Sequence, residues 1–285
     1  MHYIRQPIKE LYFEYLTLRT SNKSSFLNIF AFFKYLISPR RISKSRKSYE
    51  LTKKIRSFDD NDYKDIYFHS HETISAISSQ WINSPSNEQR SEIDKIFSQN
   101  KRQEGKTNQN IIHYEKWKGN LALNEYFAMC LEEIKSNTQD VKNFKLQNAY
   151  FINDEYGFET YAHKFHHDDV GLRMKAWFVI DAIGEIGIEY QDLPYTDIKE
   201  RRYGIPYDTY AIRNKDLTEN STKKIHAKKG VSYLLNTDIF HRGFMKPESK
   251  RLAFVIEFIN FNKMKEINGL SDACHFNEQV ASLKF

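Results

Sequence analysis

The chain has 285 residues, 40% hydrophobic and 15% aromatic, which excludes an intrinsically disordered protein and is enough to bury a sizeable core. Its two cysteines, Cys130 and Cys274, exclude a disulfide-rich scaffold and favour a reducing, cytoplasmic location. The net charge of +6 arises in residues 40–56, where eight basic residues accompany one glutamate, so the charge does not indicate nucleic-acid binding by the whole protein.

Residues 1–57 are predicted to form a helical, basic N-terminal extension. Apolar residues recur at helical spacing over residues 3–18, and residues 26–37 form a second, strongly apolar stretch. That stretch is too short to span a bilayer, which needs about twenty residues. Two interpretations of residues 26–56 stay open. They form either a helix packed on the protein with a solvated basic face, or an interfacial helix whose basic residues attract anionic lipid. We expect no signal peptide, because charged, helix-like sequence follows the first residues.

Residues 58–285 are predicted to form one domain that begins with helices. A loop over 83–87 has turn-forming residues, and residues 91–96 form a short helical piece. Residues 99–109 are polar and are predicted to be a weakly ordered connector. Residues 121–134 carry apolar side chains at helical spacing, which predicts a helix packed on the outside of the core.

Beyond residue 137 the hydrophobic period changes from helical to alternating. Strands are predicted over residues 146–153, 158–166, 174–180, 187–190, 231–235 and 252–260. A block of helices followed by several short strands predicts an α+β fold. The tyrosine-rich segment 191–220 is long for a loop in a compact domain, and we expect it to be a lid over a functional site.

Candidate metal ligands stand within residues 165–175 and near residue 241. Successive side chains of a strand alternate between faces, so His166 and Asp168 are expected to share a face while His167 points away. His241 follows the apolar run 231–235. Two histidines and one carboxylate on one face of an octahedral metal leave the opposite positions open, which is the arrangement of non-haem Fe(II) oxygenases.

Arg251 stands ten residues after His241, at the start of another apolar run. Its planar guanidinium could hold the carboxylate of an oxo acid through two parallel hydrogen bonds. The order of these residues resembles that of the Fe(II)/2-oxoglutarate dioxygenases. It consists of a His-x-Asp tripeptide, a long gap, and then a histidine and an arginine about ten positions apart. The flanking text Phe-His-His-Asp-Asp-Val-Gly-Leu-Arg-Met-Lys, followed by Ala-Trp-Phe-Val-Ile, resembles the phytanoyl-CoA dioxygenase-like branch of that family. The resemblance covers roughly residues 145–260.

The resemblance implies a double-stranded β-helix, the cupin-type jelly roll, with flanking helices. It also implies an enzyme that converts 2-oxoglutarate and dioxygen to succinate and CO2 while hydroxylating a small-molecule, lipid or sugar-derived substrate. The presence of Asp168 favours hydroxylation, since halogenating relatives lack this carboxylate. The implied Fe(II) ligands are His166, Asp168 and His241, and the implied 2-oxoglutarate contacts are Arg251, Lys175 and Trp177.

Several alternatives stay open beside these assignments. His167 and Asp169 also form a His-x-Asp pair, although the family pattern after the aspartate favours His166 and Asp168. Trp177 is equally well explained as a core residue. For Arg251 the less favoured alternative is an exposed charge at the start of a strand. The whole protein is alternatively a catalytically silent metal-binding jelly roll, or a peripheral membrane protein that acts through its basic N-terminal segment. Many relatives carry Gly-Pro and Gly-Ser-His segments after the central strand, and this chain lacks them, so the resemblance does not identify the substrate.

Overall fold

A computed structural model describes residues 84–100, 109–137, 144–157, 173–191, 222–237, 240–260 and 278–283. Several predictions lie outside these residues: the N-terminal helices, the domain boundary at residue 57, the strand over 158–166, and the lid beyond Gln191. Among the described helices, none is long and apolar enough to cross a membrane.

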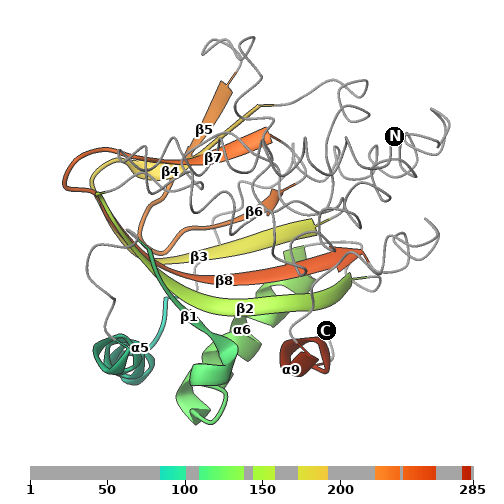
Figure 1. The fold of residues 1–285 in the computed structure, drawn as a ribbon. Coiled ribbons are helices and arrows are strands. Elements are labelled where there is room, and N and C mark those ends of the chain that lie inside the picture. Colours follow the sequence, from blue (N-terminus) through green and yellow to red (C-terminus); the bar gives the residue numbers. More distant parts are fainter. Residues whose placement is uncertain are drawn as a thin grey trace, which may run out of the picture.

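The described residues form mostly antiparallel β-structure with a few helices, and the strands are arranged in two sheets (Figure 1). The larger sheet has the order β1-β2-β8-β3-β6 and the smaller sheet the order β5-β4-β7. The strands of the larger sheet are β1 (Gln109–His113), β2 (Phe144–Glu155), β3 (Arg173–Ile183), β6 (Ser232–Asn236) and β8 (Lys250–Asn260). Those of the smaller sheet are β4 (Ile186–Gln191), β5 (Thr222–His226) and β7 (Phe240–Met245).

The connections between β3 and β4, and between β7 and β8, each carry the chain from one sheet to the other. Gly184 lies in the first connection and has a φ of 73°, a conformation that glycine adopts without strain. Its neighbour Glu185 accepts hydrogen bonds at its carbonyl from the Lys246 backbone N–H (2.9 Å) and the Ser249 hydroxyl (2.9 Å) in the second connection. The two connections are therefore tied together, and they close one end of the space between the sheets.

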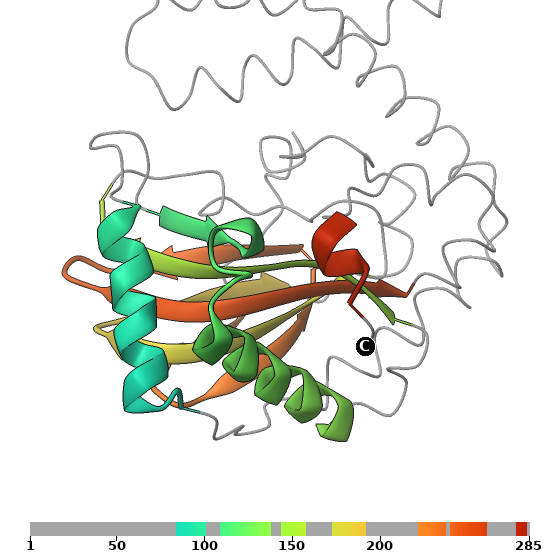
Figure 2. The same cartoon turned by 90° about the horizontal axis from the view of Figure 1, so that it is seen from below.

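Helices cover the outer face of the larger sheet, as Figure 2 shows from below. They are α5 (Asn87–Gln99), α6 (Leu121–Asn137) and the short α9 (Glu278–Ala281), with a 3-10 turn, η1, at Tyr114–Lys116. Helix α5 begins with a capping box, because the Ser86 hydroxyl accepts from the Gln89 backbone N–H while the Gln89 side chain accepts from the Ser86 N–H. The cap makes this helix longer than the predicted piece over 91–96.

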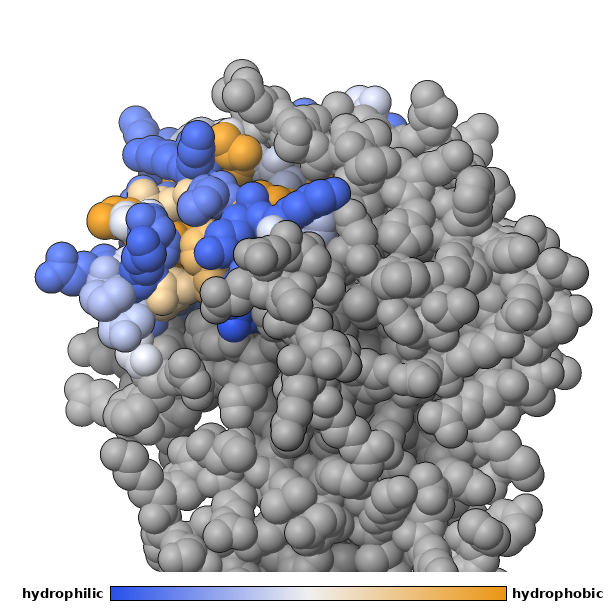
Figure 3. Space-filling view, turned by 90° about the horizontal axis from the view of Figure 1, so that it is seen from above, coloured by the Kyte–Doolittle hydropathy of each residue, from blue (hydrophilic) through white to orange (hydrophobic). Residues whose placement is uncertain are grey.

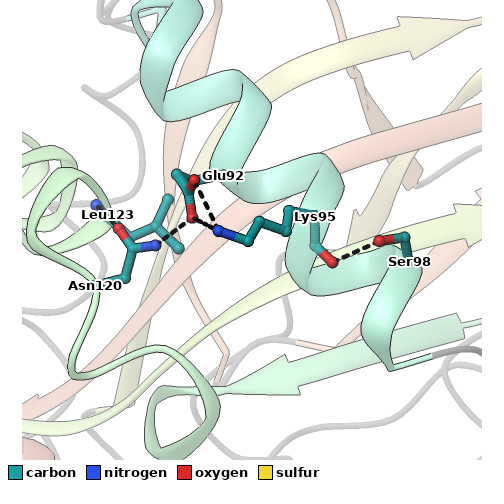
Figure 4. A network of polar contacts seen from close by, with 5 residues as sticks. All are labelled: Glu92, Lys95, Ser98, Asn120 and Leu123. Carbon is teal, nitrogen blue, oxygen red and sulfur yellow. Dashed lines mark hydrogen bonds and ion pairs between the residues drawn. The ribbon is translucent and has the colours of Figure 1, made fainter.

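The start of α6 is fixed by contacts with α5 (Figure 4). The Asn120 side-chain oxygen accepts from the Leu123 backbone N–H at 3.1 Å, and the Asn120 amide nitrogen donates to the Glu92 carboxylate at 2.6 Å. Lys95 also donates to Glu92, at 3.2 Å. Glu92 thus orients the amide that caps the neighbouring helix, which couples the position of α6 to that of α5.

Two hydrophobic layers result from the alternation of side chains in the larger sheet. The outer layer, between sheet and helices, is rich in aromatic rings such as Trp117, Phe151 and Phe254, with 4.6 Å between the ring centroids of the last two. The inner layer, between the two sheets, includes Trp177 from the larger sheet and Ile188 from the smaller one. The inner layer positions the candidate site.

The predicted helix over 121–134 and five of the predicted strands are confirmed, namely those in β2, β3, β4, β6 and β8. Other elements were missed. Strand β1 begins at Gln109, where the sequence predicted a connector, and strands β5 and β7 and helix α9 were not predicted. Each of these four is six residues or fewer, too short for its hydrophobic period to be recognised.

Candidate active site

The inner face of strand β8 carries two charged residues among small and apolar ones. Arg251, Ala253, Val255 and Glu257 alternate with residues of the outer layer, and both charged side chains are buried. A buried charge is costly unless it is paired and hydrogen-bonded. Each of the two therefore indicates a polar site built into the space between the sheets.

Arg251 is 4% exposed, which excludes the interpretation of an exposed charge at the start of a strand. Its Nε and Nη2 donate to one oxygen of Asp154, at 2.9 and 2.6 Å, and its Nη1 donates to the Tyr233 hydroxyl at 3.2 Å. The guanidinium also lies over the Trp177 ring, 4.2 Å from its centroid. Trp177 in turn stacks on Tyr233 with 6.0 Å between ring centroids. These contacts fix the guanidinium in one place.

Burial by itself would lower the pKa of the Arg251 guanidinium, but the charge of Asp154 and the contact with Tyr233 outweigh it. The pKa of Arg251 is consequently raised above its ordinary value, and the group stays charged at every working pH. An arginine has five N–H donors, and the hydrogen bonds to Asp154 and Tyr233 use three of them. The other two have no hydrogen-bond partner among the described residues.

A second polar cluster lies on the same inner face, six residues further along β8. The Tyr150 hydroxyl donates to Glu257 at 2.9 Å, and the Lys175 ammonium lies 3.2 Å from the same carboxylate oxygen. Lys175 and Trp177 are two apart on β3 and share its inner face, but they belong to different clusters. Trp177 contacts Arg251, whereas Lys175 contacts Glu257.

His241 lies on strand β7 and is 6% exposed. Residues two apart on a strand share a face, so His241 lies on the same side of β7 as Met245, which packs against the inner layer. Its strand partner is Tyr190, which also packs against that layer. The His241 imidazole therefore belongs to the wall that faces the larger sheet and Arg251.

His241 and Arg251 lie on different sheets. The chain passes from one to the other through the end of β7, the connection over 246–249 and the start of β8.

The outer face of the smaller sheet carries a separate charged cluster that holds β4, β5 and β7 together. Glu189 accepts from the Thr222 hydroxyl at 2.7 Å, and Arg242 donates to it at 2.7 Å through Nε. Burial would raise the pKa of Glu189, but these donors outweigh it and the pKa lies below its ordinary value. Seen from this side, the described residues are mainly hydrophilic (Figure 3). The cluster supports the strand that carries His241.

Of the predicted metal ligands, only His241 lies within the described residues; His166 and Asp168 lie outside them. Within the described part of the chain, no group of three or more His, Cys, Asp or Glu residues could hold a metal ion. Sequence reasoning missed Asp154, Tyr233 and Glu257 as partners of the predicted residues. Asp154 has a recognisable signal, because it continues the inward-facing alternation of Tyr150 and Ile152 as a carboxylate.

No family model and no curated protein matches this chain. Among solved structures, it is similar to the non-heme alpha ketoglutarate dependent carbocyclase SnoK from nogalamycin biosynthesis, with a TM-score of 0.46 and 12% identity over 60% of this chain and 73% of that chain. It is also similar to HygX from Streptomyces hygroscopicus with nickel, 2-oxoglutarate and hygromycin B bound, with a TM-score of 0.40 and 12% identity over 61% of this chain and 79% of that chain. With TM-scores below 0.5, these likenesses establish neither a fold nor a chemistry for this chain.

Proposed function

We propose that this chain is an Fe(II)/2-oxoglutarate-dependent dioxygenase that hydroxylates a small-molecule, lipid or sugar-derived substrate, and that its two sheets form a double-stranded β-helix. The observation that carries the proposal is the burial of the Arg251 guanidinium on the inner wall, which His241 faces from the opposite sheet. A charged arginine that is held rigidly inside a protein, with two N–H donors that no described residue accepts, can bind a carboxylate.

The described residues fit the two groups that the proposal requires. His241 is a buried imidazole, the commonest type of metal ligand, and His166 and Asp168 would complete the set of two histidines and one carboxylate. Arg251 would hold the far carboxylate of 2-oxoglutarate. When bound, Fe(II) would supply the activation of dioxygen that is coupled to conversion of 2-oxoglutarate into succinate and CO2.

The chain's own residues would position the cosubstrate and exclude water. Trp177 and Tyr233 form an apolar, stacked floor that holds the Arg251 guanidinium in the plane needed for two parallel hydrogen bonds. The closed end between the two connections would keep water from the far end of the cosubstrate. Lys175, which is paired with Glu257, would line the inner wall away from Arg251 rather than contact the carboxylate that Arg251 holds.

The test is the formation of succinate from 2-oxoglutarate by the purified full-length chain with and without Fe(II). We expect iron-dependent succinate formation that is lost in His166→Ala and His241→Ala. The matched control is His226→Ala, because His226 is exposed on β5 and, among the described aromatic residues, makes a T-shaped contact with Phe244. Retention of activity in His167→Ala would support the register with His166 and Asp168.

Two outcomes would favour the alternative functions. Metal binding without succinate formation under any condition would indicate a catalytically silent jelly roll. Loss of the protein's role in the cell on deletion of residues 1–57, while the purified protein still forms succinate, would assign that role to the N-terminal segment and to a lipid surface or protein partner.

A further inference from the structure

The buried pair of Arg251 and Asp154 is an unusual anchor for a carboxylate. Asp154 is fully buried, and one of its oxygens, Oδ2, accepts both hydrogen bonds from the guanidinium. Its other oxygen, Oδ1, has no hydrogen-bond partner among the described residues, and the same holds for the Trp177 indole nitrogen. Both of these atoms belong to side chains that touch the Arg251 guanidinium.

The charge of the anchor is already compensated before any ligand enters. A second carboxylate that binds the remaining N–H donors of Arg251 would lie close to the carboxylate of Asp154, in a place shielded from water. Like charges at that distance repel.

An uncharged polar group meets no such repulsion at the same place. Its carbonyl or ether oxygen accepts from Arg251 or from the Trp177 indole N–H, which has no other described partner. Asp154 therefore weakens the binding of an anionic group at the anchor and leaves the binding of an uncharged polar group nearly unchanged.

We propose that Asp154 sets the selectivity of the anchor for the far end of the 2-oxo acid, so that oxo acids with an uncharged polar far end compete with 2-oxoglutarate. The inference rests on the proposed function, since it concerns the same cosubstrate site. Asp154 acts through Arg251 and is a specificity-determining residue rather than a catalytic one.

The experiment measures dissociation constants by titration calorimetry on the full-length, Ni(II)-loaded protein, which binds without turning over. The two ligands are 2-oxoglutarate and its 5-methyl ester, in which the far carboxylate is uncharged. We expect the native protein to prefer 2-oxoglutarate by less than about tenfold, and Asp154→Asn to tighten 2-oxoglutarate by about tenfold or more while the ester changes little. Asparagine keeps an oxygen that can accept from Arg251, so the anchor stays in place.

The matched control is Glu155→Gln. Glu155 is the next residue on β2, and its exposed carboxylate pairs with Lys250 at 3.3 Å. This variant removes the same charge from the same strand without touching Arg251, so its two dissociation constants should equal those of the native protein. A tightening of 2-oxoglutarate of similar size in both variants would overturn the role of Asp154, because it would reflect net charge alone.

The remaining outcomes separate the inference from the proposed function. A preference of the native protein for 2-oxoglutarate above tenfold overturns the inference and leaves the function intact, and this comparison stands even if Asp154→Asn does not fold. An unchanged preference in a folded Asp154→Asn variant also overturns it. Failure of both ligands to bind the native protein overturns the proposed function, and the inference with it.

Discussion

Replacing Arg251 by methionine, alone and together with a replacement of Asp154, separates the effect of Arg251 on stability from its effect on 2-oxoglutarate binding. The change removes the partner of a fully buried carboxylate, since the side chains of Arg251 and Asp154 are 5% and 0% exposed. Breaking a buried ion pair from one side costs about 3–5 kcal/mol. Loss of the contact with the Trp177 ring adds about 1 kcal/mol. We expect Arg251→Met to lower the free energy of unfolding by about 4–6 kcal/mol.

The double variant Asp154→Leu/Arg251→Met should recover most of this loss. Replacing both members of a buried pair with apolar residues of similar volume is often neutral, because no buried charge is left uncompensated. We expect its free energy of unfolding to return to within about 1–2 kcal/mol of the native value, again because the pair is replaced as a unit. Urea denaturation followed by tryptophan fluorescence gives both values, and titration calorimetry shows whether 2-oxoglutarate still binds.

The double variant should therefore be folded and unable to bind 2-oxoglutarate. Binding with native affinity would refute the role of Arg251 as the anchor. A double variant as unstable as Arg251→Met would refute the assignment of the stability loss to an uncompensated buried carboxylate.

Three further predictions concern the parts of the fold that support the site. The pKa of Glu189 is lowered from its ordinary value of 4.5, so its contribution to stability is complete above pH 4.5 and is lost as the pH falls below it. In Glu189→Gln the free energy of unfolding should therefore fall less steeply as the pH is lowered below 4.5. A pH dependence as steep as that of the native protein would contradict this. Asn120→Ala removes the cap of α6 and should cost about 1 kcal/mol in urea denaturation. Asn120→Ser should retain the cap, because its hydroxyl can accept from the Leu123 N–H and adds no second carboxylate beside Glu92. Gly187→Ala places a Cβ against the Ile225 carbonyl, so β4 and β5 must separate there. We expect the amides of β5 to exchange hydrogen faster than in the native protein. Exchange at the native rate would contradict the separation of the two strands.

Hydrophobic periodicity was sufficient for the long elements of this fold. Strands β2, β3 and β8 alternate over eleven or twelve residues and face a helical layer on one side and a second sheet on the other. The short edge strands were missed for a physical reason. Strand β5 reads Thr-Lys-Lys-Ile-His and is stabilised by its pairing with β4 rather than by an apolar face of its own.

The start of α5 shows a different limit. The loop-like text before it contains Ser86, and the same residue that favours a turn also caps a helix when Gln89 stands three positions later. The same residues are therefore compatible with a loop and with the start of a helix. The hydrogen bonds of the capping box favour the helix.

The sequence named Arg251 and His241 as candidate site residues but not their partners. Arg251 was expected to hold the carboxylate of an oxo acid, and this role stays a prediction; the structure shows the side chain buried on the inner face of β8. Its pairing with Asp154 depends on the register of β2 against β8, which joins residues 97 positions apart. No local pattern encodes that register, so neither the charge compensation nor the separation of Lys175 from the anchor could be derived from the sequence.

The most direct test of the proposed function is a crystal structure of the full-length chain grown without oxygen in the presence of Fe(II) and 2-oxoglutarate. The account predicts one metal ion bound by His166, Asp168 and His241, with the far carboxylate of 2-oxoglutarate within hydrogen-bond distance of Arg251. A metal bound elsewhere, or a 2-oxoglutarate that lies away from Arg251, would contradict it.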